Sequence, residues 1–194
     1  MRKGEYERQT KETDVRVVLV IEGNGAYNIQ TGVPFFEHML AMLAKFSGMD
    51  LNIYARGDLE VDAHHTVEDV GICLGEALNQ ALGDKSGIRR FAHAVVPMDD
   101  ALVMVAVDLS GRGYLAYDVE MPAPTVGTFD TELVSEFMRA LAVYGRFNLH
   151  VRLLAGHNTH HIIEACFKAL GRALGDAMRV TAAGGIPSTK GVIN

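Results

Sequence analysis

Two stretches of sequence decide the fold: Asp62-Ala63-His64-His65-Thr66-Val67-Glu68-Asp69 and Asn158-Thr159-His160-His161-Ile162-Ile163-Glu164-Ala165. Each reads His-His-x-x-Glu and leads into an apolar run of helical character, residues 70–82 after the first box and 166–178 after the second. His64 and His160 are 96 positions apart, which is about half of the 194-residue chain. A polar motif that returns at half the chain length indicates an internal duplication.

The spacing inside each box predicts metal binding. On a helix, residues three and four apart share a face, whereas adjacent residues point about 100° apart. We therefore expect His65 and Glu68 to bind the same ion or ligand, while His64 points in another direction. In the second box, His161 and Glu164 should bind together, while His160 points in another direction. Imidazole and carboxylate together suit a first-row divalent metal. The alternative is a polar helix start whose first-turn acid complements the positive helix end, and the repetition in register favours metal.

Composition limits the class of protein. A chain of 194 residues, 48% hydrophobic and 22% charged, is expected to form one packed soluble unit or two small fused halves. A net charge of −6 argues against a nucleic-acid partner. Cys73 and Cys166 sit in apolar runs and are expected to be small buried hydrophobes. With no N-terminal signal and no apolar stretch of about 18 residues, we expect a cytoplasmic protein without a membrane partner.

Both halves of the chain show the same order of elements. We expect strands at 15–21, 26–30, 51–55, 91–96, 101–109, 114–119 and 149–154, the first two forming a hairpin. Helices should start at Pro34, follow each box, and run over 131–144 with Asp130 as the cap. The predicted fold is α+β: an internal duplication of two β-β-α-β-α type halves, each with its sheet on one side and helices on the other. The boundaries are 1–86 for the first half, 87–181 for the second and 182–194 for a substrate-binding tail.

The duplication predicts two equivalent metal sites, each needing more ligands than one box supplies. Overlaying the halves places His38 on Glu136, and both residue types ligate metals. The alternative for His38 alone is a satisfied core histidine. We expect the ligands to divide into two sets: His38, His65, Glu68 and His160 for one ion, and His64, Glu136, His161 and Glu164 for the other.

Three cations stand beside Gly- or Ser-containing turns: Arg90, Arg112 and Lys190, the last following Ser188. A cation next to exposed backbone amides and a hydroxyl can bind phosphate. Each cation taken alone favours a surface charge, whereas their common setting points to a phosphate pocket.

In the two His-His-x-x-Glu boxes and the segments around these cations, the chain resembles the imidazoleglycerol-phosphate dehydratase family of histidine biosynthesis. The resemblance runs in order along nearly the whole chain, over 35–40, 62–69, 83–91, 99–102, 108–112, 156–165 and 188–191. It implies a duplicated α+β fold, two Mn²⁺ per active site, and a large homo-oligomer of the 24-subunit type with sites at subunit contacts. Some members of the family carry His at position 136, so Glu136 makes that site more anionic.

The resemblance also implies the chemistry, which is loss of water from a phosphorylated imidazole carrying a hydroxylated side chain. Two metals on the ring nitrogens would favour imidazolate, which expels the hydroxyl through a diazafulvene-like intermediate; proton loss then gives an enol and its ketone. Glu12 is the candidate acid–base and substrate-binding residue, with a generic exposed glutamate as the alternative. Glu68 and Glu164 are expected to be catalytic through the metals, and Arg90, Arg112, Ser188 and Lys190 to hold the phosphate.

Two other functions compete with this one. A metal-storing or metal-sensing assembly would account for the paired boxes but not for the cations. A di-metal phosphohydrolase would account for both, and would release phosphate instead of forming an enol.

Overall fold

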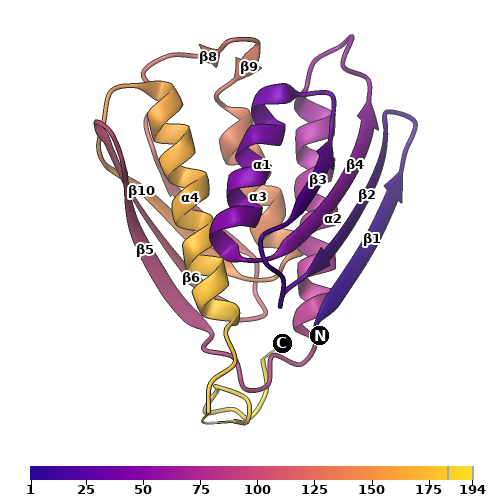
Figure 1. Ribbon diagram of the computed structural model, residues 1–194, viewed down its shortest axis with the longest axis vertical. Coiled ribbons are helices and arrows are strands. Elements are labelled where there is room, and N and C mark those ends of the chain that lie inside the picture. Colours follow the sequence, from indigo (N-terminus) through magenta and orange to yellow (C-terminus); the bar gives the residue numbers. More distant parts are fainter. Residues whose placement is uncertain (183, 194) are drawn as a thin grey trace.

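Four helices lie between two four-stranded sheets in the computed structural model of the chain, which describes residues 1–182 and 184–193 (Figure 1). The first half contains β1 (Lys3–Gln9), β2 (Thr13–Val20), β3 (Tyr27–Gln30), α1 (Pro34–Ser47), β4 (Asp50–Gly57) and α2 (His64–Leu82). The second contains β5 (Phe91–Met98), β6 (Ala101–Asp108), β7 (Tyr114–Asp118), α3 (Leu133–Tyr144), β10 (Asn148–Ala155) and α4 (Thr159–Met178). A short ribbon of β8 (Thr125–Val126) and β9 (Phe129–Asp130) precedes α3.

The two sheets repeat one topology. Their strand orders are β1-β2-β4-β3 and β5-β6-β10-β7, with the last pair parallel in each sheet. The registers also agree, because Arg8 lies opposite Val15 and Val96 lies opposite Val103, a constant shift of 88 positions. The predicted fold class, a duplicated α+β fold with sheet on one side of each half and helices on the other, is therefore confirmed. The two helix layers face each other and share the core (Figure 1).

Alternation of side chains explains why these strands form the outer layers. In β2 the side chains of Val15, Val17 and Leu19 are fully buried, whereas Asp14 and Arg16, which alternate with them, face solvent. A period of two places one set on the helices and the other outside.

The predicted hairpin between 15–21 and 26–30 is wrong. β2 pairs with β1, and β3 pairs in parallel with β4 instead. β1 was not predicted from the sequence, because it is an edge strand with charged, mostly exposed side chains such as Lys3, Glu7 and Arg8. The predicted cap is also wrong: Asp130 belongs to β9, and Glu132 precedes α3 without a side-chain capping bond.

Close helix contacts join the halves. A Cβ on Gly71 of α2 would lie 2.9 Å from Ala140 Cβ of α3, so only glycine permits this approach. Phe137 of α3 lies edge-on to Phe36 of α1, with ring centroids 5.2 Å apart, and stacks on Phe167 of α4 at 5.4 Å. All four helices begin at the same end of the molecule, the upper end in Figure 1. Across the described residues, no helix is both long and apolar enough to cross a membrane.

Candidate metal and phosphate-binding sites

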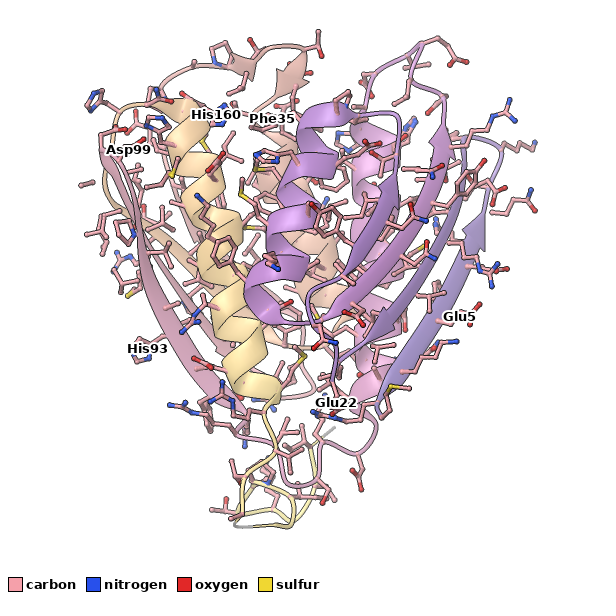
Figure 2. The ribbon with its side chains drawn as sticks, viewed as in Figure 1. Glu5, Glu22, Phe35, His93, Asp99 and His160 are labelled. Carbon is pink, nitrogen blue, oxygen red and sulfur yellow. The ribbon has the colours of Figure 1, made fainter. Side chains whose placement is uncertain are left out.

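Imidazoles and carboxylates gather where the four helices begin. Between α1 and α4, Glu164 is only 6% exposed, and its Oε1 lies 3.3 Å from His38 Nε2 and 3.1 Å from His160 Nε2. Its Oε2 accepts a hydrogen bond from Lys168 Nζ at 2.8 Å. Phe35 packs against the His160 ring with centroids 5.3 Å apart (Figure 2). We call His38, His160, Glu164 and Lys168 the α1–α4 cluster.

The charge of Glu164 is preserved despite its burial. Burial alone would raise the pKa of Glu164, but hydrogen bonds from Lys168 and His160 outweigh it and hold the pKa below its usual value. The carboxylate is therefore ionised at neutral pH, as a metal ligand must be.

A second cluster lies between α2 and α3. Arg139 Nη2 donates to Glu68 Oε1 at 3.3 Å and also bonds Glu136. His64 precedes Glu68 by one turn, as His160 precedes Glu164. We call His64, Glu68, Glu136 and Arg139 the α2–α3 cluster. Each cluster thus places one cation, Lys168 or Arg139, against its carboxylates.

The remaining histidine of each box is held by a carboxylate from outside its helix. His65 Nδ1 lies 3.0 Å from Asp58 Oδ2, and His161 Nδ1 lies 2.7 Å from Asp100 Oδ1. Asp100 also accepts the backbone N–H groups of His157 and Asn158. The first of these backbone bonds, followed by the bond to His161, lowers the pKa of Asp100 far below its usual value.

Within one chain, the grouping differs from the predicted ligand sets. His38 and His160, expected to share an ion with Glu68, contact Glu164 instead. Glu136, expected beside Glu164, shares Arg139 with Glu68. The contacting pair in the second box is His160–Glu164, four residues apart, because Asp100 turns His161 away.

Among residues 1–182 and 184–193, no group of three or more His, Cys, Asp or Glu is arranged to hold a metal ion within one chain. The donor types nevertheless fit a divalent cation. Two imidazole Nε2 atoms converge on one carboxylate oxygen, and His65 and His161 are buttressed at Nδ1, as metal-bound histidines commonly are. The assignment of His38, His64, His65, Glu68, Glu136, His160, His161 and Glu164 to particular ions remains a prediction.

The predicted phosphate-binding residues meet at the opposite end of the molecule. Arg90, Arg112, Ser188 and Lys190 line one cavity of about 600 Å³, together with Ser110. Arg90 anchors this cavity: its Nε donates to Asp108 Oδ1 at 2.7 Å and its Nη1 to the carbonyl of Pro187 in the tail at 2.8 Å. The tail predicted over 182–194 therefore folds against the start of β5, although residues 183 and 194 lie outside the described residues.

Glu12 lies at the metal end, not at the phosphate end. It is in the β1–β2 connection, its side chain is 57% exposed, and Oε2 is 3.9 Å from His65 Nδ1. Its acid–base role remains a prediction.

Sequence reasoning missed several residues of these sites. Lys168 and Arg139 could have been found from their spacing to Glu164 and Glu136, because residues three or four apart on a helix meet. Asp58 carried no signal, since it lies in a turn.

The chain is similar to one known protein family over most of its length. The sequence model of the family described as imidazoleglycerol-phosphate dehydratase matches residues 31–174. The imidazoleglycerol-phosphate dehydratase of Desulforudis audaxviator (strain MP104C) is 73% identical over 194 residues, covering 100% of this chain and 99% of the relative. That of Pelotomaculum thermopropionicum is 61% identical over 189 residues, covering 97% of each chain.

Solved structures show the same fold. The crystal structure of imidazoleglycerol-phosphate dehydratase from Staphylococcus aureus subsp. aureus N315 matches with a TM-score of 0.84 and 41% identity, covering 92% of this chain and 99% of that one. The Pyrococcus furiosus enzyme in complex with (S)-C348 matches with a TM-score of 0.84 and 41% identity, covering 96% and 99%.

Proposed function

The chain belongs to the imidazoleglycerol-phosphate dehydratase family, and we propose that it converts D-erythro-imidazoleglycerol phosphate to imidazole-acetol phosphate and water in histidine biosynthesis. It is accordingly a hydro-lyase. The observation that carries the proposal beyond family membership is the cavity lined by Arg90, Arg112, Ser188 and Lys190. Two guanidinium groups, an ammonium and a hydroxyl suit a phosphate dianion, and a metal-storage protein has no use for them.

The two ends of the chain are too far apart to share one substrate. α4 has 20 residues and therefore spans about 30 Å, with His160 at its start and the tail after its end. In the substrate, only a three-carbon chain separates the imidazole from the phosphate. We therefore propose that each active site takes its metal ligands and its phosphate pocket from different copies, within a large homo-oligomer of the 24-subunit type.

Two Mn²⁺ per active site complete the proposal. The α1–α4 and α2–α3 clusters, with His65 and His161, would hold them. When bound, such ions act as Lewis acids that stabilise negative charge on the imidazole. Lys168 donates a hydrogen bond to Glu164, and Arg139 bonds Glu68 and Glu136, so that one cation faces the carboxylates of each cluster.

The residues of the chain supply the binding and proton steps. The phosphate cavity fixes one end of the substrate and so orients its two hydroxylated carbons. The C–O bond next to the ring breaks, and the leaving hydroxyl takes up the proton that the ring N–H gives up, so that it departs as water. Glu12 removes the proton from the neighbouring carbon, which gives an enol, and the enol becomes the ketone when the carbon next to the ring is protonated. Glu68 and Glu164 act in this proposal as ligands.

A turnover assay tests the function. Purified protein loaded with Mn²⁺ and given imidazoleglycerol phosphate should form the ketone product while its phosphate stays covalently bound. Release of inorganic phosphate from this or another phosphomonoester would identify a phosphohydrolase instead. Absence of both reactions in protein shown to contain metal would favour metal storage. Cytoplasmic location remains a prediction, with which the free, buried Cys73 and Cys166 agree.

A further inference from the structure

Each His-His-x-x-Glu box has one histidine whose Nδ1 faces a carboxylate. Asp58 presents both oxygens to His65 Nδ1, at 3.0 and 3.2 Å. Asp100 approaches His161 Nδ1 at 2.7 Å. All four side chains are partly buried, between 20% and 36% exposed, so water competes only in part for these contacts.

The two carboxylates come from different places in the duplicated fold. The strand registers, shifted by 88 positions, make Glu12 the counterpart of Asp100, because both stand just before the second strand of their sheet. Asp58 follows β4, and the residues after β10 are Gly156 and His157, neither of which is a carboxylate. The two histidines are equivalent in the duplicated fold, but the carboxylates that contact their Nδ1 atoms, Asp58 and Asp100, are not. Duplication alone therefore does not account for the repeated His–carboxylate contact.

We propose that Asp58 and Asp100 are positioning residues that fix the tautomer of His65 and His161 and present the Nε2 of each ring to a divalent cation. A neutral imidazole has one N–H, and an ionised carboxylate can only accept, so the proton resides on Nδ1 and the lone pair on Nε2. This inference rests on the metal sites of the proposed function. It also leaves Glu12 available for proton transfer, because Asp58 and not Glu12 makes the short contact with His65.

Other charged groups face these rings as well. Asp99 Oδ2 lies 3.5 Å from His161 Nε2, on the side offered to the metal, and is 70% exposed. Glu12 lies 3.9 Å from His65 Nδ1, farther than Asp58. Asp100 additionally binds the backbone N–H groups of His157 and Asn158, so changing it would also disturb the loop before α4. Asp58 makes its side-chain hydrogen bonds to His65 and is the cleaner residue to change.

The test measures Mn²⁺ binding to the full-length protein by titration calorimetry, with thermal unfolding of the metal-free protein alongside. Asp58→Asn keeps the shape but can offer an N–H to Nδ1, and Asp58→Ala removes the acceptor. Glu60→Gln, an exposed acid in the same connection, is the charge-matched control. Both Asp58 variants should bind Mn²⁺ about 10- to 100-fold more weakly than the wild type, with unchanged metal-free unfolding temperature, while Glu60→Gln binds normally.

Unchanged affinity in both Asp58 variants would overturn the inference. The inference would also be overturned if the Asp58 variants lost Mn²⁺ affinity and their metal-free form became less stable to the same extent, because a carboxylate with a purely structural role would have both effects. A wild-type protein that binds no Mn²⁺ would instead overturn the metal part of the proposed function, so the two failures are distinguishable.

Discussion

Lys190→Ala separates a phosphate-binding tail from a structural one. Lys190 lines the cavity with Arg90 and Arg112, and its backbone N–H donates to Ser188 Oγ at 3.2 Å, which shapes the turn independently of its side chain. Replacing the side chain by alanine should therefore leave the turn in place and remove only the ammonium group. The expected result is a lower kcat/KM for the phosphorylated substrate.

The magnitude distinguishes two kinds of contact. A charge-assisted hydrogen bond in a partly closed cavity contributes about 1.5–3 kcal/mol, which corresponds to roughly ten- to a hundredfold in kcat/KM. A solvent-screened pair at the surface contributes only about 0–1 kcal/mol, or at most roughly fivefold. We expect the larger effect, because Lys190 lines the same cavity of about 600 Å³ as Arg90 and Arg112, so that a bound phosphate meets several cations at once.

The assay is product formation at several concentrations of imidazoleglycerol phosphate and of an analogue without phosphate, at matched metal content. Arg89→Ala is the control, since Arg89 is an exposed cation next to Arg90 that does not line the cavity. Lys190→Ala should impair the phosphorylated substrate and hardly affect the analogue. Equal losses on both substrates would refute the reasoning and make the tail structural.

Three further predictions concern the metals and stability. Single alanine substitutions in the two boxes should lower bound metal, by elemental analysis, well below two ions per chain; full occupancy in any variant would remove that residue from the ligands His64, His65, His160 and His161. Chelation should reduce the particle size in light scattering, because ligands from both halves of the chain would bind one ion, which couples metal binding to folding and association; an unchanged particle after verified metal removal would contradict this. Asp50→Ala should destabilise the metal-free protein at neutral pH, because the N–H groups of Asn24 and Ala26 hold the pKa of Asp50 below its usual value. That contribution is present above the unfolded pKa of about 3.9 and is lost as the pH falls toward the folded pKa, so a gap from wild type that stays constant down to pH 2 would contradict it.

The sequence predicted most of the helices and strands because they carry strong local patterns. β2 alternates buried and exposed residues, and Pro34 begins α1 as predicted. The partner of β2 was not predictable in the same way. β1 has the charged composition of a loop, and only pairing to Val15–Val20 of β2 makes it a strand. The parallel position of β3 beside β4 likewise depends on contacts between distant segments.

At the candidate sites, too, local sequence patterns indicated which residues matter but not how those residues group in space. The identity of the polar residues followed from the repeated boxes and the resemblance, and the structure brings Arg90, Arg112, Ser188 and Lys190 to one cavity. Their grouping at the metal end did not follow, because helix spacing alone does not say that Asp100 withdraws His161 or that α1 brings His38 to Glu164. The His38–Glu164 contact is set by packing of α1 against α4, and the Asp100–His161 contact by the β5–β6 connection lying at the start of α4, and no local pattern encodes either.

The central claim is that one active site combines the metal end of one copy with the phosphate end of another. Co-expression of Lys190→Ala with His160→Ala, each carrying a different affinity tag, tests it directly. His160→Ala alone should be nearly inactive, and Lys190→Ala alone should keep only about a tenth to a hundredth of the wild-type kcat/KM. Mixed assemblies purified through both tags should be more active than either variant, because some sites then pair an intact metal end with an intact phosphate cavity. Mixed assemblies with no more activity than the separate variants would contradict the claim.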